Sequence, residues 1–225
     1  MFSRLTHRLG KPNWKYLLTE VLLIVIGINV GLWFNTLSTK RKARQQEREV
    51  LEEMTYSLRH DQEVMDEILK IHQDGVEAGN RLVVPKDSLH VGQAAYDLVT
   101  LWHYSYFDPD YTSYESLKNY GLRIIRDPGL RRQIVNLYNT RYRAVAEATE
   151  YHRQRATAFE PVMVELFDYK DNQYSFRDAG LQSVADQSYR IKGLINSHYY
   201  ISYQCKTEAI PALDSLLTSV RDYLD

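Results

Sequence analysis

Residues 40–75 read KRKARQQEREVLEEMTYSLRHDQEVMDEILKIHQDG, with no proline and no glycine before Gly75. Apolar residues recur there in alternating steps of three and four, which places them along one side of an α-helix. This row, the seam, consists of Leu51, Met54, Leu58, Met65 and Ile68. Asp61 interrupts the same spacing and His72 ends it. The pattern predicts a stalk helix over residues 38–75 with a coiled-coil seam.

The residues before the stalk are apolar enough to cross a membrane. Residues 16–37 carry Glu20 as their only charge, and about 20 apolar residues span the hydrocarbon of a bilayer. Trp14, Tyr16 and Trp33 stand near the two ends, as interfacial aromatic residues do. A signal peptide has a shorter apolar run and small residues at its cleavage site. We therefore predict an uncleaved transmembrane helix over 16–37, preceded by a basic tail over 1–15.

Polar and small residues share one side of this predicted span. At about 100° per residue they fall in a stripe roughly 80° wide. The stripe contains Glu20, Ile24, Gly27, Gly31 and Asn35. The two glycines have the G-x-x-x-G spacing, which lets two helix backbones approach closely. The alternative is an ordinary anchor with polar ends, in which Glu20 reaches toward the membrane surface. We expect the stripe to pack against a second span.

The basic residues that flank the span predict no orientation. Four precede it and five follow it: Arg4, Arg8, Lys11 and Lys15, then Lys40, Arg41, Lys42, Arg44 and Arg48. The positive-inside rule compares these two groups, and they nearly cancel.

Residues 76–225 are expected to form an antiparallel helical bundle, because helical patterns alternate with short turns. Asp87 or Ser88 can begin one helix, and Gly121 can end another. Asp127 followed by Pro128 is a strong helix start. Pro161 and Pro211 predict kinks or ends, and YKDNQYSFRDAG (169–180) a polar linker. The fold class is therefore all-α: one transmembrane helix, a stalk helix and a bundle.

Two blocks of sequence carry a family resemblance. The first is E-x-x-L-I-V-I-G-I-x-x-G-L-x-x-N (residues 20–35), followed by a basic stretch and a long charged helix. The second is Y-x-S-L-K-N-Y-G-L-x-I-I-x-D-P-x-L-R (residues 114–131), where Tyr120 replaces the small residue that usually precedes the glycine. The chain thereby resembles a family of short single-span proteins of Bacteroidota that is a domain of unknown function. The resemblance implies a bacterial inner-membrane protein with a helical soluble part, and no activity.

The sequence contains no recognisable catalytic or metal-binding motif. Seven histidines are present, yet no H-E-x-x-H, no Glu-x-x-His repeat and no cysteine-rich spacing. Phosphate-binding and nucleophile-elbow motifs are absent as well. We therefore expect no enzyme activity, no metal and no cofactor.

Two local clusters have a functional and a structural interpretation. Arg141, Arg143, His152, Arg153 and Arg155 can bind an anion, but interleaved Glu147 and Glu150 favour a solvated helix face. YTSYESLKNYG (111–121) can line a ligand pocket, but a capped helix that packs Tyr111, Tyr114 and Leu117 inward explains it better. The structural interpretation is preferred for both.

A net charge of −1 gives no reason to expect nucleic-acid binding. The sequence favours a noncatalytic membrane-anchored protein that assembles through its transmembrane and stalk helices and serves as a scaffold or interaction subunit. Its partners would be the lipid bilayer and further copies or another membrane protein. One alternative is an oligomeric channel or transporter subunit with Glu20 or Asn35 facing the pore. The other is a membrane-tethered ligand sensor.

Overall fold

The computed structural model describes residues 14–84, 89–170, 173–177 and 184–225. It confirms the all-α fold class: a long apolar N-terminal helix and a bundle of helices, with a single short hairpin in the described part of the chain. The chain divides into two compact units, residues 1–48 and residues 49–225. The expected basic tail falls almost entirely outside the described residues.

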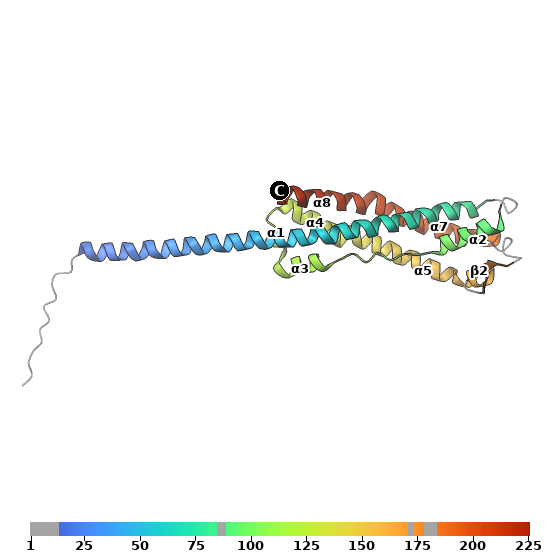
Figure 1. Ribbon diagram of the computed structural model, residues 1–225, viewed down its shortest axis with the longest axis horizontal. Coiled ribbons are helices and arrows are strands. Elements are labelled where there is room, and N and C mark those ends of the chain that lie inside the picture. Colours follow the sequence, from blue (N-terminus) through green and yellow to red (C-terminus); the bar gives the residue numbers. More distant parts are fainter. Residues whose placement is uncertain (1–13, 85–88, 171–172, 178–183) are drawn as a thin grey trace, which may run out of the picture. The chain divides into compact units, whose positions relative to one another are not determined.

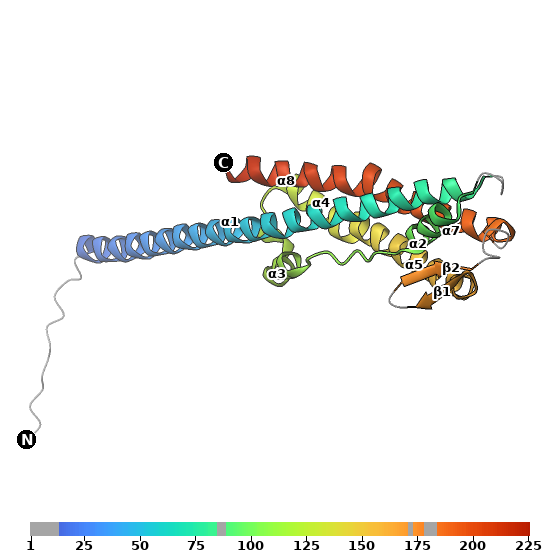
Figure 2. The same ribbon diagram turned by 45° about the vertical axis from the view of Figure 1, so that its right-hand side comes forward.

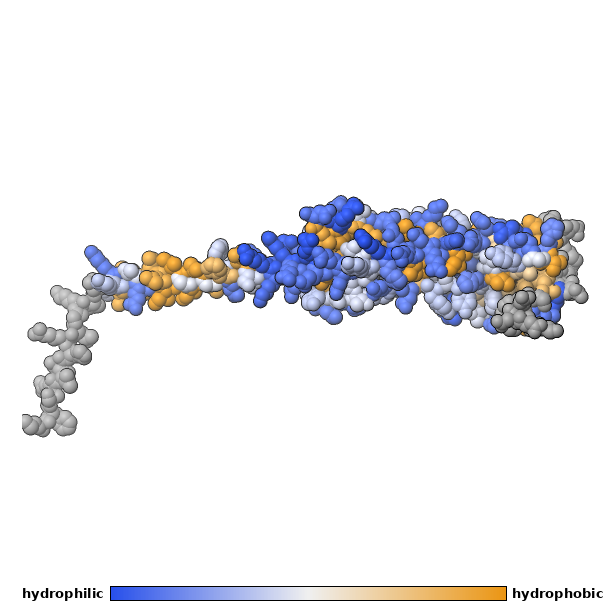
Figure 3. All heavy atoms as spheres, in the orientation of Figure 1, coloured by the Kyte–Doolittle hydropathy of each residue, from blue (hydrophilic) through white to orange (hydrophobic). Residues whose placement is uncertain are grey.

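The first unit consists, where described, of the beginning of helix α1 (Trp14–Leu82). Every side chain from Trp14 to Thr36 is exposed, including long aliphatic residues such as Leu23 and Ile24. We name this apolar surface the sleeve, and the face of it in view in Figure 3 is mostly orange with white patches. This part of α1 is the one described segment that is long and apolar enough to cross a membrane.

Three long helical columns form the second unit (Figures 1 and 2). The first is α1 from residue 49 onward. The second is α4 (Pro128–Asn136), a π-helical segment η3 (Leu137–Arg141) and α5 (Tyr142–Leu166). The third is α7 (Ser188–Tyr203), a π-helical segment η4 (Gln204–Ala209) and α8 (Ile210–Leu224), and it runs antiparallel to the other two.

The connection between the first two columns crosses the length of the bundle. It begins with α2 (Val91–Trp102) and ends with α3 (Thr112–Tyr120) and a 3₁₀ turn, η2 (Leu122–Ile124). Between α2 and α3 the chain is extended over residues 103–111, which we name the return segment. Because this segment leads the chain back to the other end of the bundle, α1 and α4–α5 run in the same direction.

The seam is buried within the chain's own bundle. Its residues are 0–2 % exposed and lie in one apolar core with Leu117, Ile134 and Leu213: Leu51, Met54, Leu58, Met65 and Ile68. The helix was predicted correctly, and the chain divides at residue 49, within the predicted stalk. The seam packs against helices α3, α4 and α8 of the same chain.

The ends of several helices agree with their local signals. The Asp127 carboxylate accepts a hydrogen bond from the Leu130 N–H at 2.6 Å, and Pro128 opens α4. Gly121 ends α3 with a φ of +89°, a conformation that glycine adopts without strain. The helix start expected at Asp87 or Ser88 lies outside the described residues.

Other ends differ from the expectation. Helix α1 continues past Gly75 to Leu82, and α5 continues past Pro161 to Leu166. Pro211 lies directly after η4, and the helix continues through it to Leu224. The predicted polar linker contains part of an antiparallel hairpin, β1 (Phe167–Lys170) and β2 (Gln173–Phe176), with Phe167 opposite Phe176.

Candidate functional site

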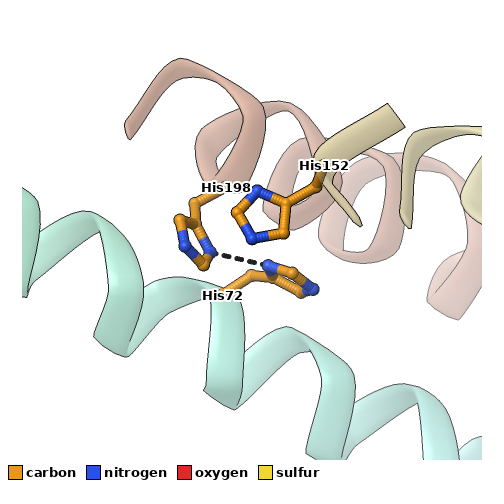
Figure 4. Close-up of side chains that lie close together, drawn as sticks. All are labelled: His72, His152 and His198. Atoms are coloured by element: carbon orange, nitrogen blue, oxygen red, sulfur yellow. Dashed lines mark hydrogen bonds between the residues drawn. The ribbon is translucent and has the colours of Figure 1, made fainter. Parts of the chain in front are cut away.

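Three histidines from the three helical columns meet in the middle of the bundle. His72 lies on α1, His152 on α5 and His198 on α7, and each is 0 % exposed. One ring nitrogen from each lies within 4.8 Å of the other two. Figure 4 shows the rings converging, with a hydrogen bond of 2.7 Å between His72 Nδ1 and His198 Nδ1. We name these residues the histidine cluster.

One nitrogen of each ring, Nε2, lies within hydrogen-bond distance of the stretch of chain from Leu101, near the end of α2, to Ser105. His198 Nε2 lies 2.8 Å from the Leu101 carbonyl oxygen, and His152 Nε2 lies 3.1 Å from that of His103. His72 Nε2 lies 2.9 Å from the Ser105 hydroxyl. The three anchors are therefore alternate residues, 101, 103 and 105, of one continuous stretch.

Hydrogen-bond chemistry assigns most of the protons. A carbonyl oxygen only accepts, so His198 Nε2 and His152 Nε2 carry hydrogens. His198 Nδ1 in the neutral ring is then an acceptor, and His72 Nδ1 donates to it. The Ser105 hydroxyl donates to His72 Nε2 in this arrangement. The Ser197 hydroxyl, 2.8 Å from His152 Nδ1, also has the Leu194 carbonyl oxygen at 2.8 Å as an acceptor.

Burial keeps these rings uncharged. Loss of hydration lowers the pKa of His72 to about 2, of His198 to about 3 and of His152 to about 4. The neighbouring imidazoles act in the same direction: His198 and His152 lower the pKa of His72, and His152 lowers that of His198, with a smaller effect of His103 on each of the three. The cluster is therefore neutral near pH 7, the form in which imidazole donates a lone pair.

Gly75 makes room for the cluster. A Cβ at this position would lie 2.4 Å from Cε1 of His198 and 2.5 Å from its Nδ1. One turn further along, a Cβ at Gly79 would lie 2.3 Å from a side-chain carbon of Ile195. These two glycines, which share the G-x-x-x-G spacing, let α7 lie directly against α1. Gly75 was expected to end the stalk helix, but its role is to provide space within it.

A second buried polar group is Asp61, the residue that interrupts the spacing of the seam on α1. The Asp61 carboxylate is 1 % exposed and accepts a hydrogen bond from the Asp110 N–H at 2.8 Å. The Asp110 carboxylate in turn accepts from the Ser57 hydroxyl at 2.8 Å. Burial raises the pKa of Asp61 to about 6, against the lowering effect of the Asp110 N–H and the Tyr142 phenol. Asp61 therefore ties the far end of the return segment to α1.

The residues of the predicted stripe on the span are exposed, in contrast to the histidine cluster. Glu20, Ile24, Gly27, Gly31 and Asn35 are all exposed in the first unit. A Cβ added at Gly27 or Gly31 would meet nothing within 4 Å. The two glycines therefore make no close approach to another part of the described chain.

The arginine cluster follows the expectation from its spacing only in part, because Arg141 pairs with Glu208 of η4. Arg143 pairs with Glu147 at 2.7 Å and Arg153 with Glu150 at 2.5 Å, which supports the solvated face. His152 does not belong to that face, because its ring turns into the core. In the tyrosine-rich run Tyr114 and Leu117 are buried, and Tyr114 stacks on Tyr138 with ring centres 4.4 Å apart, whereas Tyr111 is 37 % exposed.

Sequence reasoning missed the histidine cluster because its members are far apart in the chain. A local motif search tests residues within a few positions of one another, and these three lie on separate helices. One signal was present: His72 occupies a seam position, where an apolar residue is expected. A polar residue in a buried row needs polar partners, which was a reason to look for them.

A model for a family of unknown function, DUF6090, matches residues 20–168. The matched region contains both blocks of the resemblance, and it includes two of the three clustered histidines. The chain belongs to this family. No curated protein and no solved structure matches it. DUF6090 membership thus supports the similarity noted in the sequence and assigns no activity.

Proposed function

We propose that this DUF6090 protein is a noncatalytic, single-pass protein of the bacterial inner membrane that acts as an interaction subunit. Its span would associate with a second span through the stripe of Glu20, Ile24, Gly27, Gly31 and Asn35. The sleeve of exposed apolar side chains supports the membrane anchor, because such a surface is stable in lipid and costly in water.

The observation that carries the association is the contrast between two pairs of glycines. Gly75 and Gly79 are each pressed against a side chain of α7, which shows close helix packing at this spacing within the chain. Gly27 and Gly31 have the same spacing and an open surface. In lipid, apolar side chains gain no hydrophobic free energy by packing against another helix, because the acyl chains are equally apolar. Transmembrane helices therefore associate through surfaces of small residues, which allow close packing.

The seam does not contribute to this association. It is covered by the chain's own helices, so a partner cannot pack on it without unfolding the bundle. We therefore propose association through the span alone, with the outer surface of the second unit available for other contacts.

The test is disulfide-independent cross-linking and mass measurement of the full chain in lipid nanodiscs. The double variant Gly27→Ile/Gly31→Ile should shift an oligomer to the monomer, because branched side chains prevent close approach. The matched control is Leu22→Ile, on the opposite side of the same helix, which should leave the mass unchanged. A native protein that is monomeric at all lipid dilutions would contradict the proposal, as would a double variant that assembles like the native chain.

A further inference from the structure

We propose that the histidine cluster is a binding site for a divalent transition-metal ion, with Zn²⁺ as the ion that fits best. The observation is the convergence of one ring nitrogen each from His72, His152 and His198 within 4.8 Å, from three separate helices. Three neutral imidazoles are a common set of protein ligands for Zn²⁺, and a small ligand such as water completes the tetrahedron.

The outer hydrogen bonds have the arrangement that metal-binding histidines need. A histidine ligand usually donates its other N–H to a carbonyl or another fixed acceptor, which orients the ring. Leu101 O and His103 O are such acceptors for His198 and His152. When the His72 proton moves from Nδ1 to Nε2, Ser105 Oγ can accept a hydrogen bond from Nε2–H, since a hydroxyl can accept as well as donate.

The inner nitrogens can be released without leaving a buried group unpaired. His72 Nδ1 and His198 Nδ1 share one proton across 2.7 Å, and moving it to His72 Nε2 frees both lone pairs. At His152 the Ser197 hydroxyl can turn to the Leu194 carbonyl oxygen, 2.8 Å away, which frees Nδ1. In Figure 4 the other nitrogen of His152, Nε2, faces the two neighbouring rings, so the His152 ring has to turn before Nδ1 can become a ligand.

Binding requires a small adjustment of the rings. Two nitrogens bound to one tetrahedral Zn²⁺ are about 3.4 Å apart, given Zn–N bonds of about 2.0–2.1 Å. The shortest pair, His72 Nδ1 and His198 Nδ1, is 2.7 Å apart and has to open by a fraction of an ångström. A pair near the 4.8 Å limit of the cluster has to close by roughly 1.4 Å, given the same Zn–N bond lengths.

A bound ion would hold the three helical columns together. The ligands come from α1, α5 and α7, so one ion links all three and holds the return segment through the outer hydrogen bonds. An ion that binds only the folded chain stabilises it in proportion to the logarithm of its concentration. The role inferred here is structural and goes beyond the proposed association of the span.

The competing explanation is that the histidines serve only as hydrogen-bond partners for the return segment. To separate the two, the full chain would be purified in detergent, stripped with a chelator and dialysed. Bound zinc would be measured by elemental analysis, and the melting temperature with Zn²⁺ or Mg²⁺ added. Co²⁺ would be added in a parallel sample, because its visible absorption reports tetrahedral coordination.

The proposal predicts about one Zn²⁺ per chain, a lower melting temperature after chelation, and restoration by Zn²⁺ but not by Mg²⁺. His152→Gln should abolish zinc retention, and His60→Gln, an exposed histidine of α1, should not. Ser105→Ala should weaken Zn²⁺ binding about 10–100-fold while the chain still folds, since it removes only an outer acceptor. A native protein that retains no zinc, shows no Co²⁺ spectrum and melts at the same temperature with and without chelator would overturn the proposal. These readouts do not depend on the association of the span.

Discussion

Asp61 shows how a single buried carboxylate ties stability to pH. Its pKa is about 6 in the folded chain and 3.8 in water, so between these values the folded state holds a proton that the unfolded state releases. Stability therefore falls as the pH rises from about 4 to about 6, by about 3 kcal/mol, and the penalty is complete above pH 6. Asp61→Asn should remove this penalty and still accept the Asp110 N–H.

The measurement is thermal unfolding of the full chain in detergent between pH 4 and pH 8. The variant should be more stable than the native chain at pH 7, and the two should converge toward pH 4. Curves that stay parallel, or a variant that is less stable at pH 7, would show that Asp61 is ionised and well paired in the folded state. Asp66→Asn, an exposed carboxylate on the same helix, is the matched control and should follow the native curve.

At the residue scale, the sequence indicated which positions were unusual but not what they contact. Asp61 and His72 were visible as polar members of the seam. Their partners Asp110, Ser105 and His198 lie 33 to 126 residues away along the chain. His152 was grouped with the arginines beside it, because adjacent residues on a helix point in different directions and sequence alone did not show which one faces the core.

Helix packing depends on Gly75 at the scale of elements. Gly75→Ala places a methyl group 2.4 Å from the His198 ring, and α7 has to move away or the ring has to turn. We expect a loss of about 1–3 kcal/mol of folding free energy, the usual range for overpacking a core. The measurement is thermal unfolding of the full chain.

Gly92→Ala in α2 provides the control for this substitution. A Cβ there meets nothing within 4 Å, so the change should be neutral or stabilise the helix by up to about 1 kcal/mol. If Gly75→Ala were as harmless as Gly92→Ala, the close contact between α1 and α7 would not exist.

Local signals predicted elements well where the cause is local. Asp127 and Pro128 act on the helix they begin, and Gly121 acts through its own backbone. Gly75 and Pro161 gave wrong helix ends, because contacts with other parts of the fold determine whether the helix continues. Gly75 provides space for His198. Helix α5 continues through Pro161, and Phe159 and Val162 on either side of it are buried. The hairpin was missed because its strands are four residues each, too short to show an alternation.

At the scale of the whole molecule, the proposed function places folding stability in the second unit and association in the first. Leu58 is 0 % exposed in the core of the second unit, so Leu58→Ala should cost about 2–5 kcal/mol of folding free energy. It should leave the mass of the assembly in lipid unchanged, since the seam faces its own bundle. Thermal unfolding and mass measurement on the same sample test both statements. Loss of the oligomer in a folded Leu58→Ala protein would return the seam to the interface.

The overall division of the chain was predicted only in part. An apolar run, a long charged helix and a helical bundle all follow from hydrophobic periodicity. Hydrophobic periodicity does not predict which surface covers the seam, because a row of apolar residues at helical spacing can pack against a partner chain or against the same chain. In this chain α3, α4 and α8 cover the seam. The extended return segment that leads the chain to α3 and α4 has no periodicity from which to predict it.

The most direct test of the account is the mass and location of the chain in the cell. Membranes would be washed at alkaline pH and the protein weighed by intact mass spectrometry. An uncleaved anchor predicts a chain of 26.4 kDa that stays with the membrane pellet. A shortened chain that lacks residues 16–37 and appears in the soluble fraction would contradict the membrane anchor and the association built on it.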